Sequence, residues 1–168
     1  PSVQNSFAGW SVRQGESMNI LSRCLMALSR ESRMSIKDVT FSSEGALYTV
    51  VISSSTIEQM VSECLKADVN ETGGILIGSY SEDSSTAMIV EATTRPADSL
   101  AGRTTFQRGV RGLRPLLHAR WKTGLYYVGE WHFHPRGSPE PSGDDFRSMT
   151  SIAANPDYQC LEPVMIIL

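Results

Sequence analysis

Short runs of β-branched and aromatic residues alternate along this chain with stretches in which apolar residues recur every three or four positions. Runs typical of strands lie at 46–52, 73–80, 87–93, 125–131 and 164–168. Helical spacing marks residues 18–34, 57–65, 110–121 and 144–154. Because the two patterns interleave, the sequence predicts an α/β or mixed α+β class with a covered sheet.

The 168 residues fit one domain of ordinary size, and no repeat divides them. We expect residues 1–45 to form an N-terminal arm and an amphipathic helix, and residues 46–168 to form the domain. Ser55 or Thr56 is the expected cap of the helix that follows the first strand. In the loop 95–109, residues 104–106 are expected to pair as an edge strand.

Composition excludes several classes of protein. The formal net charge of −3 argues against a general nucleic-acid binder, and no apolar run approaches the roughly 20 residues that span a bilayer. The three cysteines, Cys24, Cys64 and Cys160, form no CxxC pair, which predicts free core thiols rather than disulfides or a thiolate zinc site. With no signal peptide visible, we expect a cytoplasmic protein that binds neither membranes nor nucleic acids.

The most informative segment is His132-Phe133-His134-Pro135, followed by Ser142 and then Asp145. The two imidazoles leave the end of the predicted strand 125–131, where side chains at i and i+2 point to the same side. Asp145 begins the next predicted helix, so the loop between can bring its carboxylate back to the histidines. Two imidazoles and a carboxylate leave one position of a tetrahedral zinc open, which is typical of catalytic rather than structural zinc.

Structural interpretations of the same residues remain open. Ser142 and Asp145 also fit the S-x-x-D pattern of a helix capping box, and a capping role does not exclude metal ligation. His118 is interpreted as an ordinary surface or core residue. Trp131 is expected to pack in the core.

The pattern HxHPx6SxxD, with Gly129 three residues before His132, resembles the JAMM/MPN+ (JAB) zinc metallo-isopeptidase family. A second element of that family, a glutamate before a strand of small residues, is matched by the segment ETGGILIG from Glu71 to Gly78. The resemblance spans residues 71–145.

The resemblance implies a cytidine-deaminase-like, three-layer α/β/α fold with a mixed sheet. It implies that His132, His134 and Asp145 bind Zn²⁺. Glu71 would be the general base that deprotonates the attacking water and then protonates the leaving amine. Ser142 would donate a hydrogen bond to the tetrahedral oxyanion.

The segments ETGGILIG, RTTFQRG and YYVGEWHFHPRGSPEPSGDD are similar to the bacterial JAB peptidases of CBASS anti-phage operons. Those operons pair the peptidase with an E1–E2-like enzyme that conjugates a cGAS-like nucleotidyltransferase to targets. The resemblance implies a deubiquitinase-like deconjugase that removes this modification. In the family the residue between the histidines is usually small and hydroxylated. Here it is Phe133, which we expect to point away from the ligands.

We therefore expect zinc-dependent hydrolysis after the C-terminus of a cGAS-like nucleotidyltransferase or ubiquitin-like protein. Its extended tail would lie beside an edge strand near Thr104, Thr105 and Phe106. Two alternatives stay open. One is another JAB peptidase that processes a ubiquitin-like or sulfur-carrier protein, and the other is a non-catalytic MPN scaffold, which the intact ligand set disfavours.

Overall fold

A computed structural model describes residues 37–135, 137 and 139–168 of the chain. The predicted N-terminal helix and Cys24 lie outside the described residues. The domain boundary between residues 45 and 46 stays a prediction, although strand β1 (Val39–Ser42), which precedes it, pairs with β2 (Thr49–Ile52) of the sheet.

Six strands form one mixed sheet in the order β1-β2-β4-β3-β7-β8. The four strands not yet introduced are β3 (Thr72–Tyr80), β4 (Thr86–Ala92), β7 (Tyr126–Phe133) and β8 (Val164–Ile167). The β2–β4 and β7–β8 pairs are parallel, and the other three are antiparallel. The central strands β3 and β7 are almost wholly buried, which explains why they read as apolar runs.

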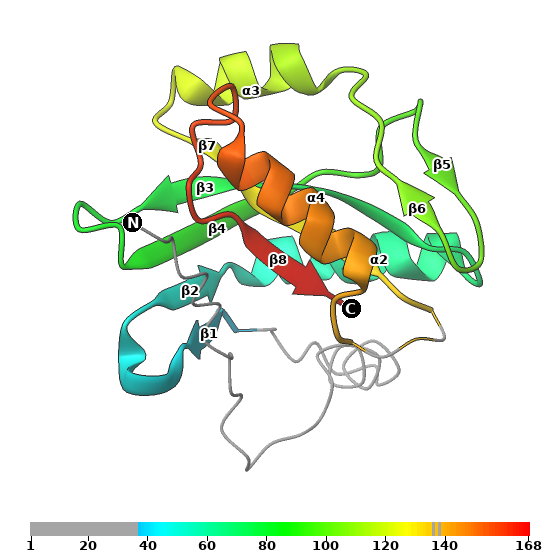
Figure 1. Cartoon of the computed structure of the whole chain (residues 1–168), viewed down its shortest axis with the longest axis horizontal. Coiled ribbons are helices and arrows are strands. Elements are labelled where there is room, and N and C mark those ends of the chain that lie inside the picture. Colours follow the sequence, from blue (N-terminus) through cyan, green and yellow to red (C-terminus); the bar gives the residue numbers. More distant parts are fainter. Residues whose placement is uncertain (1–36, 136, 138) are drawn as a thin grey trace, which may run out of the picture.

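Helices cover both faces of this sheet, as Figure 1 shows. Helix α2 (Ser54–Ala67) packs on one face, where Leu76 of β3 joins its buried residues. Helices α3 (Leu113–Trp121) and α4 (Gly143–Ala154) pack on the other, against Ile75 and Ile77. The alternation of these three residues follows the two-residue period of a strand. The predicted three-layer α/β/α arrangement is confirmed.

Two predicted element starts are wrong. The strand expected from residue 46 begins at Thr49, because Glu44–Ala46 forms a short 3₁₀ turn (η1), in which Ala46 has φ 53°. The cap of α2 is Ser53 rather than Ser55 or Thr56. Ser53 is the last extended residue, and its hydroxyl accepts a hydrogen bond from the Thr56 amide at 3.3 Å.

The predicted edge strand at 104–106 is also misplaced. A separate two-stranded hairpin joins β5 (Leu100–Ala101) to β6 (Phe106–Gln107), and it is not part of the six-stranded sheet. Thr104 and Thr105 lie in the turn between the two strands, where the Gly102 amide donates to the Thr105 carbonyl at 2.8 Å.

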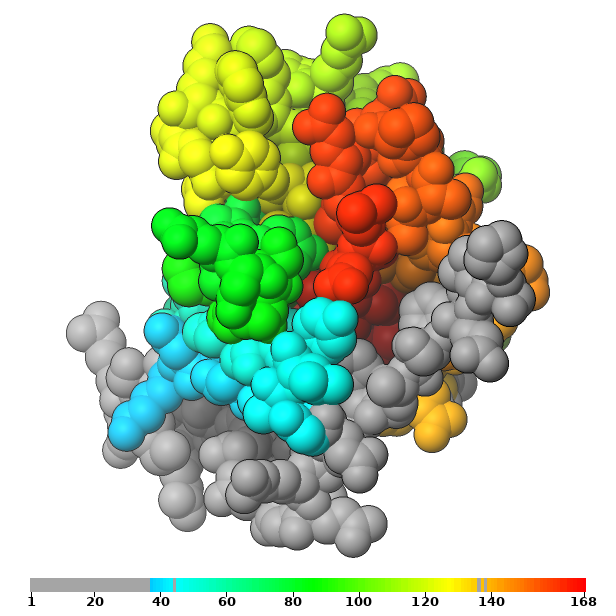
Figure 2. Space-filling view, turned by 60° about the vertical axis from the view of Figure 1, so that its left-hand side comes forward, coloured from blue at the N-terminus to red at the C-terminus, as the bar shows by residue number. Residues whose placement is uncertain are grey.

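Distant segments of the chain meet at the face drawn in Figure 2, where the β3–β4 turn (green) lies beside the C-terminal segment (red). The Tyr80 hydroxyl at the end of β3 donates to the Glu162 carbonyl at 2.9 Å. Trp131 is fully buried as predicted, and its indole N–H donates to the Thr93 carbonyl at 3.0 Å. None of the helices in the described ranges is long and apolar enough to cross a membrane.

Candidate metal centre

The last residues of β7 alternate between the two faces of the sheet. Trp131 belongs to the core beneath α2, and Phe133 packs against that core. This confirms that Phe133 points away from the candidate ligands. His132 lies between them in sequence and faces α4. The strand ends at Phe133, two residues later than predicted, so His132 sits on regular strand while His134 follows it. The rigid ladder therefore positions the first histidine.

His132, His134 and Asp145 come together at this edge of the sheet. One ligand atom from each lies within 4.8 Å of those of the other two. His132 Nδ1 is 2.8 Å from Asp145 Oδ1, and His134 Nε2 is 3.7 Å from Asp145 Oδ2. All three side chains are at most 13% exposed. Two imidazoles and one carboxylate are a donor set that zinc accepts while keeping a position open.

Ser142 and Asp145 form a complete capping box at the start of α4. The Ser142 amide and hydroxyl both donate to Asp145 Oδ2 at 2.7 Å, and the Asp145 amide donates to the Ser142 hydroxyl at 3.2 Å. The other carboxylate oxygen, Oδ1, still faces His132. Burial raises the pKa of Asp145, but hydrogen bonds from Ser142 and His132 outweigh it and hold this pKa below its ordinary value.

Glu71 lies one residue before β3, half-buried, and its amide donates to the Gly102 carbonyl at 2.8 Å. Thr72 pairs with Phe133 across the β3–β7 ladder, which brings Glu71 to the end of β7 where His134 lies. Removal from water raises the pKa of Glu71 above its ordinary value, against the attraction of His134 and His132. A carboxylate with a raised pKa beside a ligand cluster is suited to proton transfer.

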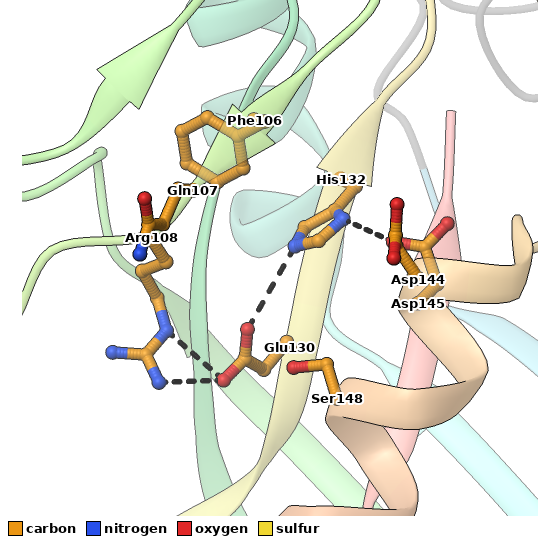
Figure 3. Close-up of a pocket in the computed structure, with 8 residues that line it drawn as sticks. All are labelled: Phe106, Gln107, Arg108, Glu130, His132, Asp144, Asp145 and Ser148. Carbon is orange, nitrogen blue, oxygen red and sulfur yellow. Dashed lines mark hydrogen bonds and ion pairs between the residues drawn. The ribbon is translucent and has the colours of Figure 1, made fainter.

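The β5–β6 hairpin forms one wall of the pocket in Figure 3, across from the wall formed by α4. The Phe106 ring meets the His132 ring edge-on, with centroids 5.2 Å apart at 83°. Of the three candidate substrate-binding residues, Phe106 alone is brought to the candidate ligands, whereas Thr104 and Thr105 are exposed in the turn.

Sequence reasoning missed an ion pair beneath this pocket. Glu130 is buried and the Arg108 side chain is 11% exposed, and Arg108 Nη2 lies 2.7 Å from Glu130 Oε1. Burial raises the pKa of Glu130, but contacts with His132 and Arg108 outweigh it and lower the pKa below its ordinary value. The signal was present in the sequence: Glu130 is a lone charge within an apolar strand, two positions before His132 and therefore on its face.

The remaining candidates behave as structural residues. His118 is exposed on α3 and stacks on Trp121 with ring centroids 6.2 Å apart. Cys64 and Cys160 are buried free thiols, as predicted. Burial raises the pKa of Cys64 to about 12, so this thiol stays protonated at neutral pH.

A family model for prokaryotic homologs of the JAB domain matches residues 53–168. This chain belongs to the family of prokaryotic JAB-domain proteins. The match includes Glu71, the β5–β6 hairpin and all three candidate ligands. The resemblance to the JAMM/MPN+ family is thereby confirmed at the level of the JAB domain, as is the fold class.

Two similar proteins are named "CD-NTase/cGAS isopeptidase". The protein from Enterobacter hormaechei subsp. hoffmannii is 97% identical over 151 residues, covering 90% of this chain and 84% of the relative. The protein from Pseudomonas aeruginosa is 34% identical over 107 residues, covering 61% of this chain and 66% of the relative. A solution structure from Desulfitobacterium hafniense aligns over 57% of this chain and 64% of its own, with 21% identity and a TM-score of 0.47.

Proposed function

We propose that this JAB-domain protein is a zinc-dependent isopeptidase that releases a cGAS-like nucleotidyltransferase from its conjugates in anti-phage defence in the cytoplasm. One observation carries the proposal: His132, His134 and Asp145 gather beside Glu71 in a chain 97% identical to a relative named CD-NTase/cGAS isopeptidase. A scaffold domain has no need for this donor set. The expected partners are the conjugated nucleotidyltransferase and an E1–E2-like enzyme of the same operon.

The described residues fit a zinc ion. One donor atom each from two imidazoles and one carboxylate lie within 4.8 Å of one another, and His132 Nδ1 already contacts Asp145 at 2.8 Å. Nitrogen and oxygen donors gathered this closely are a set that zinc accepts. His132, His134 and Asp145 would hold the zinc, which when bound supplies a Lewis acid that polarises the scissile carbonyl and lowers the pKa of water.

Glu71 would perform the proton transfers. Its raised pKa suits a group that takes a proton from the attacking water and returns it to the departing amine. The bond that breaks joins the carboxyl-terminal carbonyl carbon of the tail to the amine nitrogen. One water is consumed, the carbonyl carbon gains the oxygen, and the amine leaves with the proton from Glu71.

Ser142 is proposed to donate to the oxyanion, but its hydroxyl has one hydrogen. That hydrogen is directed to Asp145 Oδ2 at 2.7 Å. With the Asp145 carboxylate engaged as a metal ligand, Oδ2 would be a weaker acceptor, and the Ser142 hydroxyl would be able to turn toward the substrate. The capping bond from the Asp145 amide to Ser142 Oγ is compatible with this turn, because Oγ accepts it through a lone pair.

The test is cleavage of a conjugate that carries a reporter after the C-terminal residue of a cGAS-like nucleotidyltransferase. We expect wild type to release the reporter, and a chelator or Asp145→Asn to stop release, with rescue of the chelated enzyme by Zn²⁺. A ubiquitin-like fusion and a sulfur-carrier fusion serve as comparison substrates. Preferred cleavage of either one would assign the other JAB substrate class, and no zinc binding would indicate a scaffold.

A further inference from the structure

Glu130 occupies an unusual position for a carboxylate. It lies on a central strand, its side chain is 3% exposed, and it shares the face of β7 that carries His132. Its Oε1 atom accepts hydrogen bonds from Arg108 Nε at 2.9 Å and Nη2 at 2.7 Å, and from the Tyr127 hydroxyl at 3.3 Å. One oxygen of Glu130 is therefore held by three donors.

The other oxygen faces His132, as Figure 3 shows. Glu130 Oε2 lies 3.7 Å from His132 Nε2, the buried nitrogen that lacks a hydrogen-bond partner. On the opposite side of the ring, His132 Nδ1 faces Asp145. Each ring nitrogen therefore faces a different carboxylate: Nδ1 faces Asp145, a candidate ligand, and Nε2 faces Glu130.

We propose that Glu130 is a positioning residue that accepts the Nε2–H of His132 and so presents the Nδ1 lone pair to the metal. A neutral imidazole carries its proton on one nitrogen, and the partner of that nitrogen decides which one. In the metal-free geometry the nearer carboxylate, Asp145 at 2.8 Å, accepts the Nδ1–H. Once a metal occupies Nδ1, the proton of the neutral ring must lie on Nε2, where Glu130 accepts it and strengthens Nδ1 as a ligand. The distance of 3.7 Å between Glu130 Oε2 and His132 Nε2 must shorten by about 0.8 Å to reach that of an ordinary hydrogen bond. The inference rests on the proposed metal site, but not on any substrate.

Arg108 makes this arrangement possible. An unpaired carboxylate buried this close to the candidate ligands would either take up a proton or bind the metal itself. The Arg108 guanidinium neutralises it and fixes its rotation through two hydrogen bonds to the same oxygen. Arg108 also contacts the Tyr158 hydroxyl at 3.3 Å. The pair thereby connects the segment after β6 and the segment after α4 to β7, beneath the pocket.

The decisive variant replaces both members of the pair, Glu130→Leu with Arg108→Met. Removing one partner alone would bury an unpaired charge, whereas replacing both with apolar side chains is often nearly neutral for folding. The matched control is Glu91→Leu with Arg120→Met. That pair also joins a sheet strand to another element through two hydrogen bonds, but it links β4 to α3 and contacts none of the candidate ligands.

We expect the Glu130/Arg108 variant to bind zinc about 10- to 100-fold more weakly in chelator competition, with an altered visible spectrum of its Co²⁺ form. The control variant should match wild type in both. Equal zinc affinities and equal Co²⁺ spectra for all three proteins would overturn the proposal. If wild type itself bound no zinc, the proposed function would fail instead.

A measurement on wild type covers the case in which the double variant does not fold. Nitrogen-15 NMR of the histidine side chains, followed during zinc titration, reports which ring nitrogen of His132 keeps its proton. We expect Nε2 to carry the proton in the zinc-bound form, and that proton to show the signature of a hydrogen bond. A zinc-bound His132 whose Nε2 carries no proton would show that this nitrogen is the ligand, and would overturn the role of Glu130.

Discussion

Gly73 lies directly opposite His132 in the β3–β7 ladder, and no side chain fits there. A Cβ atom at this position would be 2.3 Å from the Trp131 carbonyl oxygen, 2.8 Å from His132 Cδ2 and 2.9 Å from Phe106 Cε1. The first of these neighbours is backbone in a central ladder, so it cannot move aside cheaply. The absence of a side chain at Gly73 thus keeps both His132 and Phe106 in place.

Gly73→Ala should therefore weaken zinc binding and lower the free energy of unfolding by about 1–3 kcal/mol, because the site is overpacked. Chelator competition and urea denaturation measure the two effects. Gly143→Ala is the matched control, since a Cβ there meets Arg147 Nη1 at 3.4 Å and nothing closer. Equal zinc affinity in Gly73→Ala and wild type would show that the His132 ring can shift away from the added methyl group without losing its binding geometry.

Ser142→Ala should destabilise the metal-free protein by about 0.5–2 kcal/mol at neutral pH, because α4 loses its cap. It should also change the pH dependence of stability. The folded-state pKa of Asp145 lies below its ordinary value, so its contribution is present above the unfolded-state pKa of about 4 and is lost as pH falls through the folded-state pKa. Without Ser142 this pKa moves upward, and the loss on acidification should become smaller.

Urea unfolding of both proteins at neutral pH and at about pH 3 measures the difference. Ser53→Ala removes the corresponding cap of α2, where the described contacts of the hydroxyl are with the Thr56 amide and the Ser55 and Thr56 hydroxyls, and not with a carboxylate. It should lower stability at neutral pH and leave the acid dependence as in wild type. An acid dependence in Ser142→Ala as steep as that of wild type would contradict the assignment of the pKa shift to Ser142.

The clustering of the three candidate ligands could be predicted from sequence because their geometry is mostly local. His132 and His134 share a side of an extended segment at i, i+2, and the capping box holds Asp145 at a known place in the first turn of α4. The position of Glu71 could not be predicted in this way. Glu71 reaches the same edge of the sheet only through the antiparallel pairing of β3 with β7, so its proposed role as general base rested on family resemblance and not on spacing.

Other features escaped prediction for physical reasons. Glu130 and Arg108 are 22 positions apart, and nothing local in the sequence pairs them. The strands β5 and β6 have two residues each, too few to show a period. The cap of α2 was misassigned because Ser53 is followed by three more hydroxyl residues that offer the same chemistry. Backbone conformation selected the first of the four.

Phe106→Ala should raise KM for a nucleotidyltransferase conjugate by about tenfold. The ring forms a wall of the pocket next to His132, and losing its apolar surface and edge-on contact removes about 1–1.5 kcal/mol of interaction. Steady-state cleavage kinetics measure the change. Leu161→Ala, at a side chain 85% exposed on the segment before β8, serves as control and should leave KM unchanged. An unchanged KM in Phe106→Ala would mean that the substrate tail does not pass this hairpin.

The most direct test of the central claim measures zinc content and conjugate cleavage together, in wild type and in Glu71→Gln. Glutamine keeps the shape of Glu71 but cannot accept the proton, while the three candidate ligands are untouched. We predict one equivalent of zinc in both proteins, with cleavage in wild type and at least a 100-fold lower rate in the variant. Cleavage by zinc-loaded Glu71→Gln at the wild-type rate would contradict the claim that Glu71 is the base at a metal site formed by His132, His134 and Asp145.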